Sequence, residues 1–122
     1  MSDDSRPLSI GAQGERCAEA YLCQQQLHLV MRNYRCTYGE IDLVMRDNDY
    51  LVFVEVKQRK HARFGSPLEM VSIQKQNKLR LTAQHYIATH KVPTQQAMRF
   101  DVVGIIGPPG NSSNIEWVQN AF

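Results

Sequence analysis

Two short segments constrain this chain most, because they read as the paired strands of a hairpin. Residues 42–45 and 51–54 are rich in strand-forming side chains, and residues 47–49 between them have the composition of a turn. A loop at Asn48-Asp49 pairs Asp47 with Tyr50 across the hairpin. That one pair sets the expected register of both strands.

The register brings charged side chains together. It carries Asp42 directly opposite Glu55, and Glu40 opposite Lys57. Side chains alternate along strands, so all four are expected on one face of the sheet. Directly opposed residues have Cβ atoms roughly 5 Å apart, where like charges destabilise the pair. A divalent cation between Asp42 and Glu55 relieves that repulsion, so the pattern predicts a metal site with a lysine beside it.

The chemistry of such a site follows from its donor atoms. Mg²⁺ and Mn²⁺ prefer oxygen ligands and retain water molecules beside a phosphate substrate. A cation there lowers the pKa of a bound water, while Lys57 can orient the attacking water or neutralise developing charge. Phosphodiester hydrolysis needs this combination. The alternative is a solvated sheet face whose charges hold no metal.

Charge is distributed unevenly along the chain. Residues 1–56 carry five Arg and nine acidic residues, whereas residues 57–91 carry eight Lys or Arg and one acidic residue. An acidic cluster beside a basic segment suits a polyanion held against metal-binding carboxylates. The candidates for phosphate contacts are Arg59, Arg63, Lys75 and Lys78. Simple solvation of a loop and a helix by these side chains is the alternative.

The remaining pattern predicts an α/β fold, in which helices pack on a mixed sheet. Residues 8–26 predict a helix whose apolar stripe includes Glu15. A carboxylate in that stripe is expected to be paired, hydrogen-bonded or bound to a metal, or else to lie at the exposed edge of the stripe. A second helix is expected to begin at the capping-box sequence of residues 66–69 and to run to about His90. Its buried side is expected to hold Met70, Ile73, Asn77, Leu81 and Ile87. Strands are expected over residues 27–36, 40–46, 50–57, 97–106 and 115–118.

Length and composition predict one domain that spans residues 1–122. No apolar run is long enough to span a membrane, and the first residues lack a signal-peptide pattern. The three cysteines lack C-x-x-C spacing and are expected as reduced thiols in the cytoplasm. Residues 104–110 are glycine-rich but lack the Gly-Lys-Ser/Thr of a phosphate loop, so no nucleotide cofactor is expected.

Motifs along nearly the whole chain resemble those of a known family. They are Gly11-x-x-Gly14-Glu15-x-x-Ala18-x-x-Tyr21-Leu22, Arg32-Asn33-Tyr34-Arg35, Gly39-Glu40-Ile41-Asp42-Leu43-Val44, Val52-Phe53-Val54-Glu55-Val56-Lys57-x-Arg59, Phe64-Gly65, Lys75, Arg99-Phe100-Asp101-Val102 and Trp117. An acid followed by Glu-x-Lys on the next strand, after a helix that carries a Glu, resembles the PD-(D/E)xK nuclease superfamily. The spacing is similar to that of archaeal Holliday-junction resolvases. The combined motifs resemble the YraN family of small bacterial predicted endonucleases.

The resemblance implies a restriction-endonuclease-like fold with a central mixed sheet flanked by helices. It implies that Asp42 and Glu55 bind Mg²⁺ or Mn²⁺, that Glu15 has an accessory role, and that Lys57 has a catalytic or positioning role. Ile41 stands where the superfamily carries a proline. The implied activity is phosphodiester hydrolysis in DNA, including branched DNA. Related resolvases act as two-fold dimers, so a homodimer is a state that the resemblance suggests.

Two other functions stay open from the sequence. The chain can be a nucleic-acid-binding module that keeps the fold and acts, with little turnover, within a larger DNA-processing complex. It can also be an interaction domain whose charged face is only solvated. The intact set of Glu15, Asp42, Glu55 and Lys57 favours the enzyme, and metal binding separates the interaction domain from the other two functions.

Overall fold

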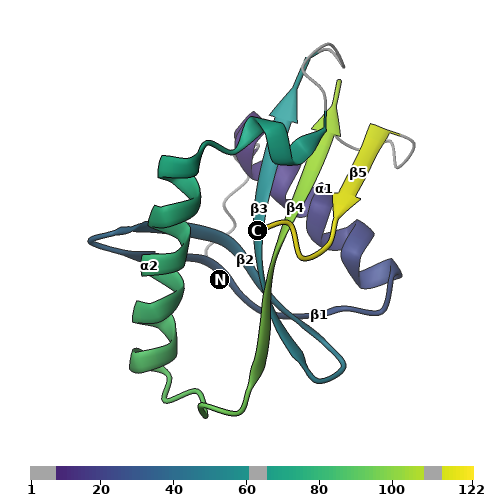
Figure 1. Cartoon of the computed structure of the whole chain (residues 1–122). Helices are drawn as coiled ribbons and strands as arrows, with labels where there is room; N and C mark the ends of the chain where they lie inside the picture. Colours follow the sequence, from purple (N-terminus) through teal and green to yellow (C-terminus); the bar gives the residue numbers. More distant parts are fainter. Residues whose placement is uncertain (1–7, 61–65, 109–113) are drawn as a thin grey trace, which may run out of the picture.

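The computed structural model describes residues 8–60, 66–108 and 114–122 (Figure 1). In chain order its elements are helix α1 (Ile10–Gln24), strands β1 (His28–Cys36), β2 (Gly39–Asp47) and β3 (Tyr50–Arg59), the 3₁₀ helix η1 (Pro67–Met70), helix α2 (Ile73–Thr89), and strands β4 (Ala97–Ile106) and β5 (Ile115–Val118). The strands form one mixed sheet in the order β1-β2-β3-β4-β5, in which β3 and β4 are parallel and the other neighbours antiparallel. The predicted α/β fold is confirmed.

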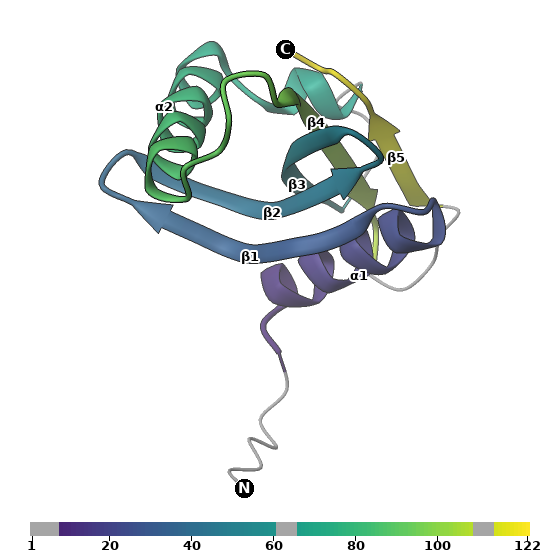
Figure 2. The same ribbon diagram turned by 90° about the horizontal axis from the view of Figure 1, so that it is seen from below.

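The two long helices cover opposite faces of the sheet, as Figure 2 shows. Ala18 and Leu22 of α1 belong to one hydrophobic cluster, and Leu79 and Tyr86 of α2 belong to the other. The central strand β3 contributes to both clusters, because the side chains of residues 51–54 are all buried. The apolar run in this segment therefore correctly predicted a central strand.

A glycine lets α1 approach the sheet closely near the end of β3. A Cβ atom built on Gly14 would lie 2.7 Å from the side-chain Oε1 of Gln58, which is closer than real Cβ contacts. The α1 backbone thus leaves room for Gln58 beside it. This approach brings the next residue of the helix, Glu15, to the edge of the sheet.

The second helix starts later than predicted. In place of one helix from Ser66, the chain forms η1, passes through an extended Val71, and begins α2 at Ile73. Ser66 makes no side-chain cap hydrogen bond, whereas Ser72 Oγ accepts one from Lys75 N–H at 3.1 Å. Ser66 is thus the N-cap of η1, with Pro67 at its start as predicted, but it makes no capping-box hydrogen bond, and the residue that caps α2 is Ser72.

The buried side of α2 also differs from the predicted one. The buried residues of the helix are Leu79, Thr82, Ala83 and Tyr86. Ile73 and Leu81, which were predicted on the buried side, are 69% and 42% exposed. The break at Val71 separates only Met70 from the predicted stripe, because Ile73, Asn77 and Leu81 lie within α2 itself, so the predicted stripe followed the wrong face of the helix.

A buried ionic network attaches the C-terminal segment to the sheet. Asp101 of β4 is fully buried and accepts hydrogen bonds from the Arg99 guanidinium. The same carboxylate accepts from Trp117 Nε1 and from Asn120 N–H, each at 2.9 Å. Phe122 then stacks on Phe100. Residues 115–122 thus pack against the hydrophobic clusters of the sheet.

Within the described ranges, no helix is long and apolar enough to cross a membrane. The three cysteines all lie in these ranges and form no disulfide.

Candidate metal centre

The hairpin of β2 and β3 has the predicted register at its turn and loses it near the predicted site. Asp47 pairs with Tyr50, and the pairing continues as far as Leu43 opposite Val54. Beyond that pair the two strands no longer form a ladder. Asp42 is the first residue of β2 past the end of the pairing, so it lies where the strands separate.

Strand β2 turns about its own axis at this point. Ile41 packs in the hydrophobic cluster of α2, whereas Leu43 packs in the cluster of α1. In a regular strand, residues two apart face the same side. The carboxylate of Asp42 crosses the gap, and its Oδ2 accepts a hydrogen bond from Val56 N–H at 2.8 Å. A side chain thus binds β3 where the ladder between β2 and β3 has ended.

The predicted position of Glu40 opposite Lys57 was wrong. Glu40 pairs with Arg35 of β1, and its carboxylate accepts a hydrogen bond from Arg35 Nε at 3.2 Å. The physical reason is the separation of the strands, because β2 stays paired with β1 after it leaves β3. The pairing expected from the turn therefore holds only for the residues of β2 and β3 that form the ladder.

The separation opens a cavity of about 320 Å³. Its lining comes from α1 (Gly11, Gly14 and Glu15), from β2 (Asp42), from β3 (Glu55, Val56, Lys57, Gln58 and Arg59) and from α2 (Lys75). The four predicted catalytic residues, Glu15, Asp42, Glu55 and Lys57, all line it. They reach one cavity although they come from three different elements.

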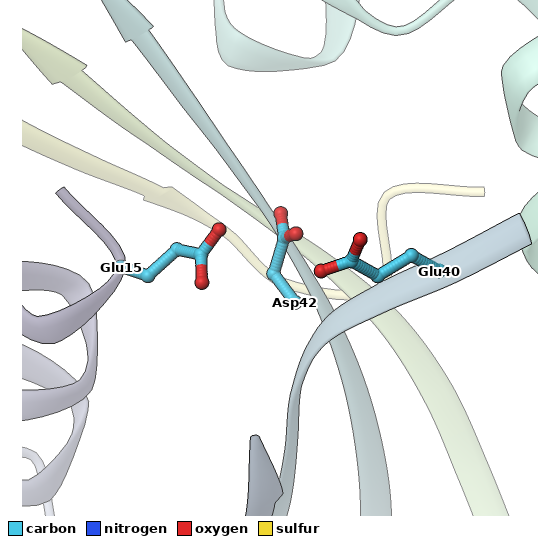
Figure 3. Close-up of side chains that lie close together, drawn as sticks. All are labelled: Glu15, Glu40 and Asp42. Atoms are coloured by element: carbon cyan, nitrogen blue, oxygen red, sulfur yellow. The ribbon is translucent and has the colours of Figure 1, made fainter. Parts of the chain in front are cut away.

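Three carboxylates converge at one side of this site. Figure 3 shows Asp42 between Glu15 of α1 and Glu40 of β2, with both glutamates directed toward it. Each residue offers one oxygen, and the three oxygens lie within 4.8 Å of one another. Glu40 was not among the predicted ligands. Its position two residues before Asp42 was the available signal, and the assumed pairing with Lys57 obscured it.

The electrostatics of the cavity favour a cation. The pKa of Asp42 is raised to about 8, first by burial and then by the neighbouring Glu55 carboxylate, while the Val56 hydrogen bond lowers it. Burial also raises the pKa of Glu15, which the Asn33 hydrogen bond partly offsets and the nearby Asp42 and Glu40 reinforce. These carboxylates therefore ionise at a cost that a bound cation would remove.

Glu55 supplies an independent sign of a ligand. Its side chain is 5% exposed, and its Oε2 accepts no hydrogen bond from any described residue. The nearest cation is Lys75 Nζ, at 3.4 Å from this oxygen. A buried carboxylate oxygen without a hydrogen bond is costly. Together with Asp42 it offers the oxygen-only donors that a hard divalent cation prefers, so the residues present fit Mg²⁺ or Mn²⁺.

The predicted phosphate-binding residues that the structure describes differ in whether they line the cavity. Arg59 and Lys75 line the cavity. Lys78, one turn further along α2, is exposed and lies outside that lining. Arg63 lies outside the described residues. Gln58 was missed by the sequence analysis, yet it lines the cavity with a buried Oε1 that has no hydrogen-bond partner among the described residues.

In the metal-free protein, we expect thermal stability to fall as the pH rises from about 4 to about 8. The pKa of Asp42 is raised from 3.8 to about 8, so between these values the folded protein keeps a proton that the unfolded chain releases. The contribution is complete below the unfolded pKa and is lost as pH rises through the folded pKa. A tenfold change in proton affinity corresponds to about 1.4 kcal/mol of unfolding free energy, and about 1 kcal/mol shifts Tm by about 4 °C. The Tm measured in the presence of chelator should therefore fall by at least about 5 °C between about pH 5 and about pH 8.5.

The control for this prediction is Asp42→Asn. Asparagine keeps an oxygen for Val56 N–H and removes the charge that faces Glu55, so the variant should melt higher than the wild type at high pH. The difference between the two proteins isolates the contribution of Asp42, because the rest of the chain is the same in both. Equal slopes of Tm against pH in the two proteins would contradict the raised pKa.

Comparison with known proteins identifies the family. The model of the uncharacterised protein family UPF0102 matches residues 14–105, which include every candidate residue named above. A UPF0102 protein of Nitrosomonas europaea is 46% identical over 112 residues, which cover 92% of each chain. One of Legionella pneumophila is 41% identical over 112 residues, again 92% of each chain, and one of Pseudomonas savastanoi is 42% identical over 120 residues, 95% of this chain and 98% of its own. The chain therefore belongs to the uncharacterised protein family UPF0102.

Proposed function

We propose that this protein is a metal-dependent endonuclease that hydrolyses phosphodiester bonds in DNA. The observation that carries the proposal is the meeting of Asp42 and the buried Glu55 with Lys57 in one cavity, beside the acidic Glu15. These are the residue types and the strand positions of the PD-(D/E)xK pattern. Family membership assigns no activity, so the proposal depends on the geometry of this site.

Asp42 and Glu55 are the residues that would hold the cation, with Glu15 as a third carboxylate. Mg²⁺ or Mn²⁺ bound there would supply a Lewis acid for the phosphate oxygens and a more acidic water. Asp42 already has one oxygen fixed by Val56 N–H, which orients the other oxygen of the same carboxylate. The hydrogen bond thus prepares the ligand before any cation arrives.

Lys57 has the position of a group that acts on the attacking water or on the phosphate. It follows Glu55 by two residues on β3, so the two side chains project to the same side of the strand. Its ammonium supplies a positive charge beside the carboxylates. A donor of this kind stabilises charge that develops on phosphate oxygens in the transition state.

A phosphate backbone would find further cations at the mouth of the site. Arg59 and Lys75 line the same cavity, and both can contact phosphates without reading base sequence. Arg63 and Lys78 are the remaining candidates for such contacts. The similarity in spacing to junction resolvases supports branched DNA as the substrate class, and a second copy of the chain would match a two-fold substrate.

We expect the wild type to cut labelled DNA in the presence of Mg²⁺ or Mn²⁺, and Glu55→Gln and Lys57→Met each to lower the rate by about 100-fold or more. The first variant removes a charged ligand and the second removes the only charge of its side chain, and losses of this size are typical of such groups. The assay uses single-stranded, duplex, flap and four-way-junction DNA together with RNA, with chelator as the blank.

The matched control is Glu116→Gln, which makes the same chemical change at an exposed position of β5 outside the cavity. It should cut as the wild type does. Activity that survives in both Glu55→Gln and Lys57→Met would sink the assigned site. Binding without cutting on every substrate would instead support the module that acts within a larger complex.

Substitutions of the two lysines of α2 should lower kcat/KM by very different amounts. Lys75 lines the cavity and lies 3.4 Å from Glu55, whereas Lys78 is exposed one turn away. Lys75→Gln should therefore lower kcat/KM by about tenfold or more, and Lys78→Gln by less than about threefold, as for a solvated phosphate contact. Equal losses in the two variants would show that Lys75 serves only as general positive charge.

A further inference from the structure

We infer that Asn33 is a positioning residue of the metal centre, which holds Glu15 and Glu40 at a fixed separation and leaves their charge available to a cation. The inference rests on the metal-binding part of the proposed function. Asn33 lies on β1, outside the cavity lining. Three features of its surroundings support the role.

The first feature is a bridge between two carboxylates. Asn33 Nδ2 donates to Glu15 Oε1 at 2.7 Å and to Glu40 Oε1 at 3.0 Å. A side-chain NH₂ has two protons, one for each acceptor. An ionised carboxylate only accepts, so the nitrogen and not the oxygen of the amide faces the two glutamates. One side chain of β1 thus joins α1 to β2.

The second feature is the charge of the bridge. Glu15, Glu40 and Asp42 present oxygens within 4.8 Å of one another, so their negative charges repel. A lysine or arginine at position 33 would hold the same oxygens but would cancel the charge that attracts a cation. The neutral amide of Asn33 holds them by hydrogen bonds alone. The other partner of Glu40, Arg35, is largely exposed, so solvent screens its charge.

The third feature is the backbone. Asn33 has φ of 52°, in the left-handed region, although it lies within a strand. Asparagine is among the few residues other than glycine that adopt this conformation without a large penalty. The neighbours Arg32 and Tyr34 pair with Leu43 and Ile41, so Asn33 lies opposite Asp42. The irregular residue of β1 thus faces the residue at which β2 turns.

A purely conformational role for Asn33 is the competing explanation, and a glycine substitution separates the two. Asn33→Gly keeps a residue that adopts the same φ freely and removes only the amide. Asn48→Gly is the matched control, because Asn48 also has φ of 52° but lies in the exposed turn between β2 and β3. Both variants should fold, with Tm values within about 3 °C of each other.

The measurement is the Kd for Mn²⁺ by calorimetric titration of the intact protein, without DNA. Asn33→Gly should raise Kd by about tenfold or more, the size typical of residues that orient metal ligands, and Asn48→Gly should change it by less than about twofold. If Asn33 acts through Glu15, its effect should shrink to less than about threefold in a Glu15→Gln background.

The outcomes separate this inference from the nuclease proposal. A tenfold weakening that is confined to Asn33→Gly supports the positioning role, whether or not the wild type cuts DNA. Equal Kd values in the two glycine variants overturn the positioning role, even if the wild type cuts DNA. A wild type that binds no Mn²⁺ overturns both.

Discussion

The hydrogen bond from Val56 N–H to Asp42 is the interaction on which the arrangement of the site depends. It forms directly after the last ladder pair of β2 and β3, so a carboxylate connects strands that no longer pair. The bond holds Asp42 beside Glu55 in a buried setting, where both charges are costly without a counter-ion. The fold therefore holds two carboxylates in an electrostatically unfavourable position where β2 and β3 separate.

The opening also explains how residues from both faces of the sheet reach one cavity. Glu15 comes from α1 and Lys75 from α2, and these helices lie on opposite faces. A continuous ladder between β2 and β3 would keep them apart, because side chains cannot pass through a paired sheet. The small size of Gly14 contributes by allowing α1 to approach the end of β3 at Gln58. Close helix packing and an interrupted sheet together assemble the site.

The sequence predicted the parts of this site that depend on local chemistry. Turn residues predicted the Asp47–Tyr50 pair, and the apolar run of β3 predicted a central strand. Alternation could not predict where the ladder ends, because the period of the side chains does not say how far two strands stay paired; past that end, Asp42 accepts a hydrogen bond from Val56 N–H. Glu40 was misplaced because the ladder between β2 and β3 ends at Leu43, and the buried face of α2 was missed because the apolar Ile73 and Leu81 lie on its exposed side.

If Asp42 and Glu55 share one divalent cation, anomalous scattering from a crystal of the protein soaked in Mn²⁺ will locate that cation. A Mn²⁺ peak is then expected in the cavity, about 2.0–2.6 Å from an oxygen of each of the two carboxylates. The Lys75 ammonium should then lie further from Glu55 than 3.4 Å. A Mn²⁺ peak elsewhere, with Asp42 and Glu55 still in contact and no peak between them, would show that the two carboxylates do not share a cation.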